Sequence, residues 1–157
     1  MLRTAASLAD GGVQVVAFPR MGELPHFNPD DDHEPLPAAA AALREGIGAA
    51  DALLICTPEY AGALPGSFKN LLDWTIGGGE IHGKRVAWIN ASGPAAPTGG
   101  ADAHDSLRKV LRYAGAAIVE DACVRVPVVR DAVGSDGFVA DPAARAVIAA
   151  AVRALVA

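Results

Sequence analysis

Two loops carry the residues whose types and spacing could do chemistry. The first, residues 58–66, reads Pro-Glu-Tyr-Ala-Gly-Ala-Leu-Pro-Gly, and the second, residues 92–100, reads Ser-Gly-Pro-Ala-Ala-Pro-Thr-Gly-Gly. Each follows an apolar run typical of a buried strand, and its glycines let a ligand approach bare backbone. Tyr60 adds an aromatic surface to the first loop. We therefore expect a binding site here.

Other reactive side chains do not suggest a better site. The run 30–34 places three aspartates beside His33. Consecutive residues cannot all point at one ion without an unusual loop, so we interpret this run as a solvated surface loop. Cys56 and Cys123 lie inside apolar runs without the spacing of a metal site, which favours reduced core thiols over a disulfide.

Composition narrows the class of protein. A chain of 157 residues with 52% apolar and 20% charged residues is typical of one folded domain, here residues 1–157. The net charge of -5 without a run of Lys or Arg argues against a nucleic-acid partner. No stretch reaches the ~20 apolar residues that span a bilayer, and Asp10-Gly11-Gly12 interrupts the first apolar stretch. We expect a cytoplasmic protein without a membrane partner.

Hydrophobic periodicity predicts alternating helices and strands. Helices are expected over residues 2–9, 37–48, 68–75, 102–114 and 142–155, and strands over 13–18, 52–57, 84–91 and 117–126. The range 52–57 is continuously apolar, which predicts a central strand. Strict alternation favours an α/β fold with a parallel sheet covered by helices on both faces. Ligands bind such sheets beyond the carboxyl ends of the strands, where both loops lie.

Residues 57–74 carry a motif that is more specific than the alternation of helices and strands. They read Thr-Pro-Glu-Tyr-Ala-Gly-Ala-Leu-Pro-Gly, followed by Lys69-Asn70 and Asp73-Trp74. With residues 24–30, Ser92-Gly93-Pro94 and Gly99-Gly100, this stretch resembles the NADPH-dependent FMN reductase family, which are flavodoxin-like quinone, azo-dye, chromate and flavin reductases. The resemblance covers residues 2–126. It implies a three-layer flavodoxin-like fold, with five parallel strands in the order 2-1-3-4-5 and FMN at their carboxyl edge.

The resemblance also implies which residues bind the cofactor. They are Pro58, Glu59, Tyr60, Ala61, Gly62, Ser92 and Gly93. In the family the first loop borders the isoalloxazine, with the aromatic ring against it, and the second loop closes the other side. A flavin needs flat contacts and backbone N–H donors near its pyrimidine edge. No catalytic side chain or metal is expected, because hydride passes from NADPH or NADH to flavin N5 and then to a small-molecule acceptor.

The sequence departs from the family at its start. Family members begin with a strand and a Gly-Ser-x-Arg-x-x-Ser loop that holds the FMN phosphate at a helix N-terminus. This sequence begins inside what should be that helix, so the first strand and the phosphate loop are both absent. Three explanations stay open. The chain is shortened relative to its natural start, strands 13–18 and 52–57 close up directly, or another subunit's segment fills the slot.

Smaller departures lie near the expected ring. Ala61 stands where Asn is common, Ala63 where Ser is common, and Asp102 where Arg is common after the paired glycines. The first two changes remove polar groups. Asp102 reverses a charge near the nicotinamide approach, which weakens the expectation of a preference for the phosphorylated dinucleotide.

The helix after the first loop reads as structural. Lys69 and Asp73 are spaced to pair at i, i+4, and Asn70 is expected to be structural too. Trp74 is expected to pack or to contact a subunit. By resemblance this helix contributes to a homodimer or homotetramer.

Two functions remain in competition. The first is an NAD(P)H-dependent FMN or quinone-type reductase that alternately reduces and reoxidises FMN. The second is a non-catalytic flavodoxin-like module, a sensor or an oligomerisation subunit that has lost flavin phosphate binding. A hydrolase is a poor third, because no Ser or Cys sits on a nucleophile elbow and the histidines read as surface loop or helix residues. The histidines are His26, His33, His82 and His104.

Overall fold

The fold is known from a computed structural model that describes residues 1–90, 92–93 and 96–157. Ala91, at the end of a predicted strand, and Pro94 and Ala95, in the second loop, lie outside the described residues. The helices are α1 (Leu2–Leu8), α2 (Ala38–Ala49), α3 (Gly66–Asp73), α4 (Ala101–Tyr113) and α5 (Pro142–Val156). The strands are β1 (Ala52–Cys56), β2 (Arg85–Asn90), β3 (Ala117–Ile118) and β4 (Val124–Arg125).

All strand pairs in the sheet are parallel, and β2 is its centre. β1 pairs with β2 from Ala52↔Arg85 to Cys56↔Ile89. On the other side, β3 and β4 both pair with β2, one with its start and the other with its end. They are two pieces of the predicted strand 117–126, separated by the 3₁₀ turn Glu120–Ala122. The predicted parallel sheet is confirmed, with this break. The expected set of five strands in the order 2-1-3-4-5 is not found, because the described sheet has the order β1-β2-β3, with β4 also paired to β2.

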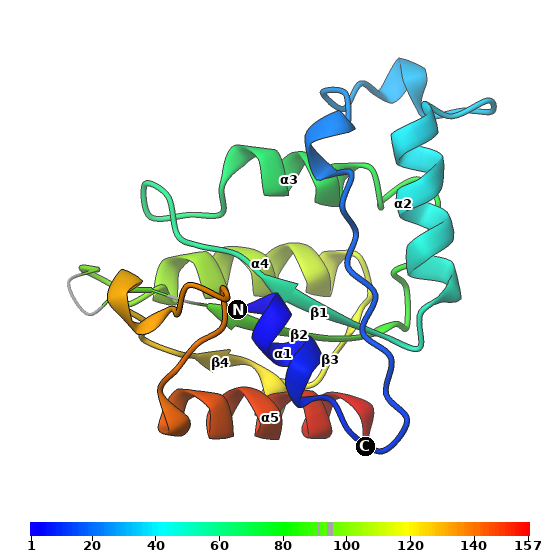
Figure 1. Ribbon diagram of the computed structural model, residues 1–157. Coiled ribbons are helices and arrows are strands. Elements are labelled where there is room, and N and C mark those ends of the chain that lie inside the picture. Colours follow the sequence, from blue (N-terminus) through cyan, green and yellow to red (C-terminus); the bar gives the residue numbers. More distant parts are fainter. Residues whose placement is uncertain (91, 94–95) are drawn as a thin grey trace.

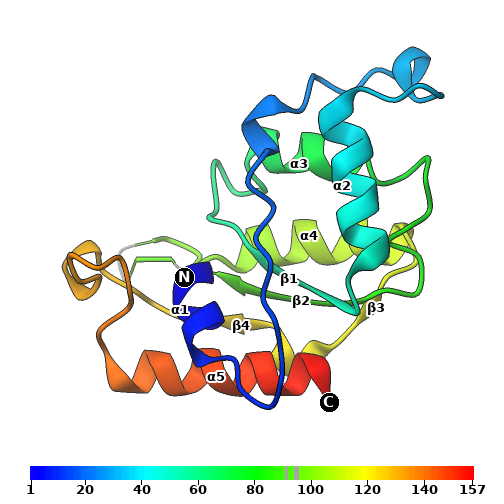
Figure 2. The ribbon, with the colours of Figure 1, turned by 45° about the vertical axis from the view of Figure 1, so that its right-hand side comes forward.

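Helices cover both faces of the sheet, which gives the three layers expected of a flavodoxin-like fold. In Figures 1 and 2, α2, α3 and α4 lie on one side of the strands, and α1 and α5 lie together on the other. Successive side chains of β2 point to opposite faces of the sheet, so β2 contributes to the hydrophobic core on each face. Trp88 packs with Leu107 of α4, whereas Ile89 packs with Ile148 of α5. Asp141 caps α5 by accepting hydrogen bonds from the backbone N–H groups of Ala143 and Ala144, at 3.3 and 3.0 Å.

The prediction of a strand at 13–18 is wrong. This segment has no regular secondary structure, and no backbone hydrogen bond joins it to β1. Among the described residues, β1 pairs only with β2, so it lies at an edge of the sheet and not at its centre. Direct closure of the two segments is therefore wrong as well. β-Branched residues favour a strand only where a neighbouring strand supplies hydrogen bonds and packing, and Val16 is 79% exposed.

The acidic run 30–34 is not wholly a solvated loop. Asp32 is the exception, because its carboxylate accepts a hydrogen bond from Nη2 of Arg44 at 2.5 Å. The two side chains are only 13% and 11% exposed. Nε of Arg44 also donates to the carbonyl of Trp74 at 2.8 Å. This contact ties the acidic loop to α2 and to the end of α3.

The structural interpretation of α3 agrees with its contacts. Nζ of Lys69 lies 2.5 Å from Oδ1 of Asp73. The Asn70 side chain accepts from the backbone N–H of Phe27 at 2.8 Å and donates to the carbonyl of Pro25 at 2.9 Å. Trp74 is fully buried, and its indole N–H donates to the same carbonyl at 2.9 Å. Asn70 and Trp74 therefore hold Pro25 and Phe27 on the domain.

Candidate functional site

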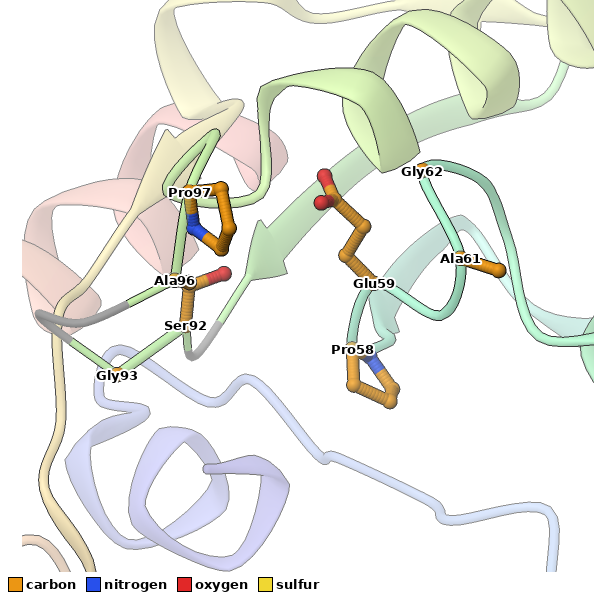
Figure 3. A pocket seen from close by; sticks show the side chains of 8 residues that line it. All are labelled: Pro58, Glu59, Ala61, Gly62, Ser92, Gly93, Ala96 and Pro97. Atoms are coloured by element: carbon orange, nitrogen blue, oxygen red, sulfur yellow. The ribbon is translucent and has the colours of Figure 1, made fainter.

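A pocket of ≈ 390 Å³ opens at the carboxyl ends of β1 and β2 (Figure 3). Its walls are the loops that follow these two strands. The lining residues are Pro58, Glu59, Ala61, Gly62, Ser92, Gly93, Ala96 and Pro97. Apart from one carboxylate and one hydroxyl, the lining consists of proline rings, methyl groups and bare backbone. Such walls suit a flat ligand that is held by its faces and its edge.

The tip of the first wall is a two-residue turn. Tyr60 and Ala63 exchange backbone hydrogen bonds, of 3.0 Å from the Tyr60 N–H and 3.1 Å from the Ala63 N–H. The two residues between them, Ala61 and Gly62, both have positive φ, at 51° and 69°. Positive φ at both central positions is the geometry of a type I′ turn, which closes a tight hairpin. The turn directs the backbone of residues 61 and 62 to the pocket.

Glu59 connects the first wall to the second and to α4. Its Oε1 accepts from the hydroxyl of Thr98 at 2.5 Å, and its Oε2 accepts from the backbone N–H of Ala103 at 3.1 Å. Ala103 lies in the first turn of α4, whose N-cap residue Gly100 supplies no side-chain cap. Figure 3 shows the Glu59 side chain directed toward this helix. The hydrogen bond from Thr98, followed by those of the α4 backbone, lowers the pKa of Glu59 below its ordinary value, so the carboxylate is ionised at neutral pH.

A second polar link lies under the pocket. The fully buried Asn90, the last residue of β2, donates from Nδ2 to the carbonyl of Thr57 at 2.8 Å. Its Oδ1 accepts from the hydroxyl of Ser92. A side chain on Gly100 would collide with Asn90 and Ser92, and Gly100 has φ 86°, so glycine is required there on both grounds. This link fixes where each loop leaves its strand.

Six of the seven residues predicted to bind the cofactor line the pocket: Pro58, Glu59, Ala61, Gly62, Ser92 and Gly93. Tyr60 does not line it, and its side chain is 64% exposed. Sequence reasoning missed Ala96 and Pro97, although both belong to the second loop and proline in such a loop is a signal for a flat wall. Asn90 and Thr98 were missed too, because nothing in their spacing reveals the partners that the fold brings to them.

Charges near the pocket come from α4 and β4. The Asp102 carboxylate lies near Gly62, with Oδ2 3.6 Å from where a Cβ on that glycine would be. Nη1 of Arg125 donates to the carbonyl of Thr98 at 3.4 Å. His104, next to Ala103 on α4, is only 7% exposed, so it is a buried helix residue and not a surface one. Burial, followed by the charges of Arg125 and Arg108, lowers the pKa of His104 to about 4.

Other candidate chemistry is not assembled in the described part of the chain. The two cysteines are free, and burial raises the pKa of both thiols, that of Cys123 to about 11. Within residues 1–90, 92–93 and 96–157, no three His, Cys, Asp or Glu side chains gather as a metal site would require. Over the same ranges, no helix has the length and apolar character to cross a membrane.

A parallel sheet with helices on both faces, and a backbone-lined pocket beyond its carboxyl edge, define a flavodoxin-like α/β protein. Residues 1–130 match the family described as NADPH-dependent FMN reductase. The chain belongs to this family.

Two relatives and one solved structure agree with this family assignment. A quinone reductase of Escherichia coli is 32% identical over 120 residues, which are 74% of this chain and 63% of that protein. An NAD(P)H-dependent FMN reductase of Pseudomonas aeruginosa is 32% identical over 156 residues, covering 98% of this chain and 83% of that protein. FerB, a flavoenzyme NAD(P)H:(acceptor) oxidoreductase from Paracoccus denitrificans, superposes with a TM-score of 0.78 at 27% identity over 98% of this chain and 86% of that one. The chain thus spans less than two thirds of the length of the E. coli relative.

The residues of the pocket fit one part of FMN. Flat, largely apolar walls and exposed backbone suit the isoalloxazine ring. The eight lining residues include no Lys or Arg that could pair with a phosphate. The first turn of α4 offers its amides elsewhere, because Glu59 accepts the N–H of Ala103. The pocket is therefore a ring site, and its lining supplies no phosphate cradle.

Proposed function

We propose that this chain is an NAD(P)H-dependent FMN reductase whose pocket binds the flavin ring and which passes electrons to a quinone-type acceptor. The observation that carries the proposal is the pocket at the ends of β1 and β2, whose two walls are the loops that match the family. The relatives named as quinone and FMN reductases support the choice of donor and acceptor. FMN, when bound, supplies the hydride-accepting and hydride-donating chemistry.

The residues of this chain bind the flavin ring and orient it. Pro58 and Pro97 present flat surfaces on opposite walls, and the backbone at Gly62 and Gly93 can come close to a ring edge because neither residue carries a side chain. Backbone N–H groups at this edge would stabilise the negative charge of a reduced ring. No side chain needs to move a proton, which agrees with a lining whose one carboxylate is engaged by Thr98 and α4.

The predicted cofactor-binding residue Tyr60 lies outside the pocket lining. Its side chain is exposed beside the pocket and not in its lining, while its backbone closes the turn. We propose that it meets the incoming acceptor at the mouth of the pocket. Tyr60→Ala would then raise the KM for a quinone more than it weakens flavin binding. Equal effects on both constants would assign the side chain to the ring instead.

The test is spectroscopic. Purified protein is titrated with FMN and with riboflavin, and NADPH or NADH is then added under nitrogen with a benzoquinone as final acceptor. We expect a bound flavin that bleaches with the nicotinamide donor and recovers its colour with the quinone. Because the lining holds the ring alone, the affinities for riboflavin and FMN should agree within about threefold. No binding of either flavin at tens of micromolar would refute the proposal.

The rival function, a non-catalytic module, is favoured by one observation. The lining provides no cation for the FMN phosphate, and Glu59 occupies the end of α4 that faces the pocket. Light scattering alongside the titration separates the two readings. A stable oligomer with no affinity for either flavin would support the module, whereas reversible bleaching would exclude it.

A further inference from the structure

Glu59 belongs to the pocket lining, and its side chain extends from the first wall toward the start of α4 (Figure 3). Both of its oxygens accept hydrogen bonds, one from the Thr98 hydroxyl and one from the Ala103 backbone. These partners belong to the loop after β2 and to α4, while Glu59 itself belongs to the loop after β1. One side chain therefore joins the loop after β1 to the loop after β2 and to the start of α4.

The hydrogen bonds that Glu59 accepts are charge-assisted. An ionised carboxylate accepts from a hydroxyl and from a helix N-terminal amide more strongly than a neutral group does. The position at the first turn of α4 adds the attraction of the helix dipole. Since Gly100 has no side chain to cap α4, the cap comes from across the pocket. Losing Glu59 would release the first wall from the second and free the start of α4 together.

We propose that Glu59 is a positioning residue that sets the separation of the two pocket walls, so that flavin affinity depends on the two hydrogen bonds that its carboxylate accepts. This inference rests on the proposed function for its ligand, but the geometry that it assigns to the protein does not. The width of the slot between Pro58 and Pro97 is the quantity that Glu59 controls. A ring that needs contacts on both faces is sensitive to that width.

The variants follow from the contacts. Glu59→Ala removes both bonds, whereas Glu59→Gln keeps an acceptor for Ala103 and a donor for the Thr98 oxygen but loses the charge. Thr98→Val removes the hydroxyl at constant shape, and Thr98→Ser restores it. Glu120→Gln is the matched control, because the Glu120 carboxylate also holds α4, through Arg108 and Arg112, but lies outside the pocket lining.

The first measurement needs no flavin. Amide hydrogen exchange of the unliganded protein should accelerate about tenfold or more at residues 59–62 and at Ala103 in Glu59→Ala, and less in Glu59→Gln. Glu120→Gln should leave these amides unchanged. Unchanged protection of Ala103 in Glu59→Ala would overturn the inference, whether or not the protein binds flavin.

The second measurement is a double-mutant cycle on flavin affinity. Glu59→Ala should weaken riboflavin and FMN binding about tenfold and Thr98→Val about threefold, and the double variant should be weaker than wild type by less than the product of the two factors. Thr98→Ser and Glu120→Gln should bind as the wild type does. At saturating flavin, kcat should change less than the affinity, because the proposed effect of Glu59 is on the separation of the pocket walls. Independent effects of the two substitutions would overturn the inference, while a wild type without flavin affinity would count against the proposed function alone.

Discussion

The side-chain amide of Asn90 donates a 2.8 Å hydrogen bond to the backbone carbonyl of Thr57, and so joins the ends of two neighbouring strands under the pocket. Asn90 is fully buried, and Thr57 is 3% exposed. Asn90→Ala would leave the buried Thr57 carbonyl without a hydrogen-bond donor and would remove the acceptor of the Ser92 hydroxyl. We expect a loss of about 3 kcal/mol in the free energy of unfolding, measured by urea denaturation.

An asparagine at the surface serves as the control for this prediction. Asn28 is exposed, and its side chain accepts from the backbone N–H of Asp30 at 3.1 Å at the start of a 3₁₀ turn. Asn28→Ala should cost about 1 kcal/mol or less. Equal losses in the two variants would show that the link under the pocket has no special weight.

Ala61 is the one non-glycine residue with positive φ among the described residues, and its turn forms the pocket wall. A left-handed backbone costs an alanine about 1 kcal/mol, whereas asparagine tolerates it. Ala61→Asn should therefore stabilise the protein by roughly 0.5 kcal/mol. The measurement is again urea denaturation.

The neighbouring glycine supplies the opposite test. A Cβ at Gly62 would meet only Oδ2 of Asp102 at 3.6 Å, an ordinary contact, so a substitution there would be opposed by the backbone alone. Gly62→Ala should destabilise by about 1 kcal/mol. A stabilising Gly62→Ala would contradict the assignment of a type I′ turn.

Much of the fold could be predicted from local sequence. The i, i+4 spacing of Leu107 and Leu111 places α4 on the sheet, and Asp141-Pro142 marks the start of α5. The segment 13–18 could not be judged in this way. Its β-branched residues favour a strand, but pairing depends on a neighbour, and no local signal reveals whether one is present.

The candidate site was predicted in the same uneven way. Its loops were found because Gly and Pro after an apolar strand are local signals, and Pro58 and Ser92 do line the pocket. The polar links were not found. Glu59 and Thr98 are 39 positions apart, and only the register of β1 with β2 brings their loops together.

Asp32 and Arg44 form a nearly buried ion pair that holds the acidic loop to α2, with side chains 13% and 11% exposed. Arg44→Ala would leave the nearly buried Asp32 carboxylate without its ion-pair partner. The free energy of unfolding should fall by about 3 kcal/mol, measured by thermal and urea unfolding. The double variant Asp32→Asn with Arg44→Met should recover most of this loss, because no lone charge remains.

An exposed ion pair gives the comparison. Nη2 of Arg20 lies 2.8 Å from Oε2 of Glu23, and the two side chains are 39% and 59% exposed. Arg20→Ala should change stability by less than about 0.5 kcal/mol. If Arg44→Ala were equally mild, the acidic loop would be free of the domain in solution.

His104 gives stability a dependence on pH in the acid range. Burial lowers its pKa to about 4 in the folded protein, against an ordinary value of 6.5. Between pH 6.5 and pH 4, His104 is protonated in the unfolded chain but not in the folded protein. The free energy of unfolding therefore falls as the pH falls from 6.5 to 4. A shift of this size corresponds to about 3 kcal/mol lost by pH 4 and nothing lost above pH 7.

The variant His104→Phe isolates this effect. Phenylalanine can keep the edge-to-face contact that His104 makes with Trp88, at 5.6 Å between ring centroids, and it carries no proton. Nε2 of His104 is buried without a hydrogen-bond partner among the described residues, so the substitution gives up no bond at that atom. The stability of wild type relative to His104→Phe should be constant above pH 7 and should fall steadily below pH 6.5. His33→Gln, at an exposed histidine, should follow the wild-type curve, and a constant difference between wild type and His104→Phe down to pH 4 would show that His104 is free to take up a proton in the folded protein.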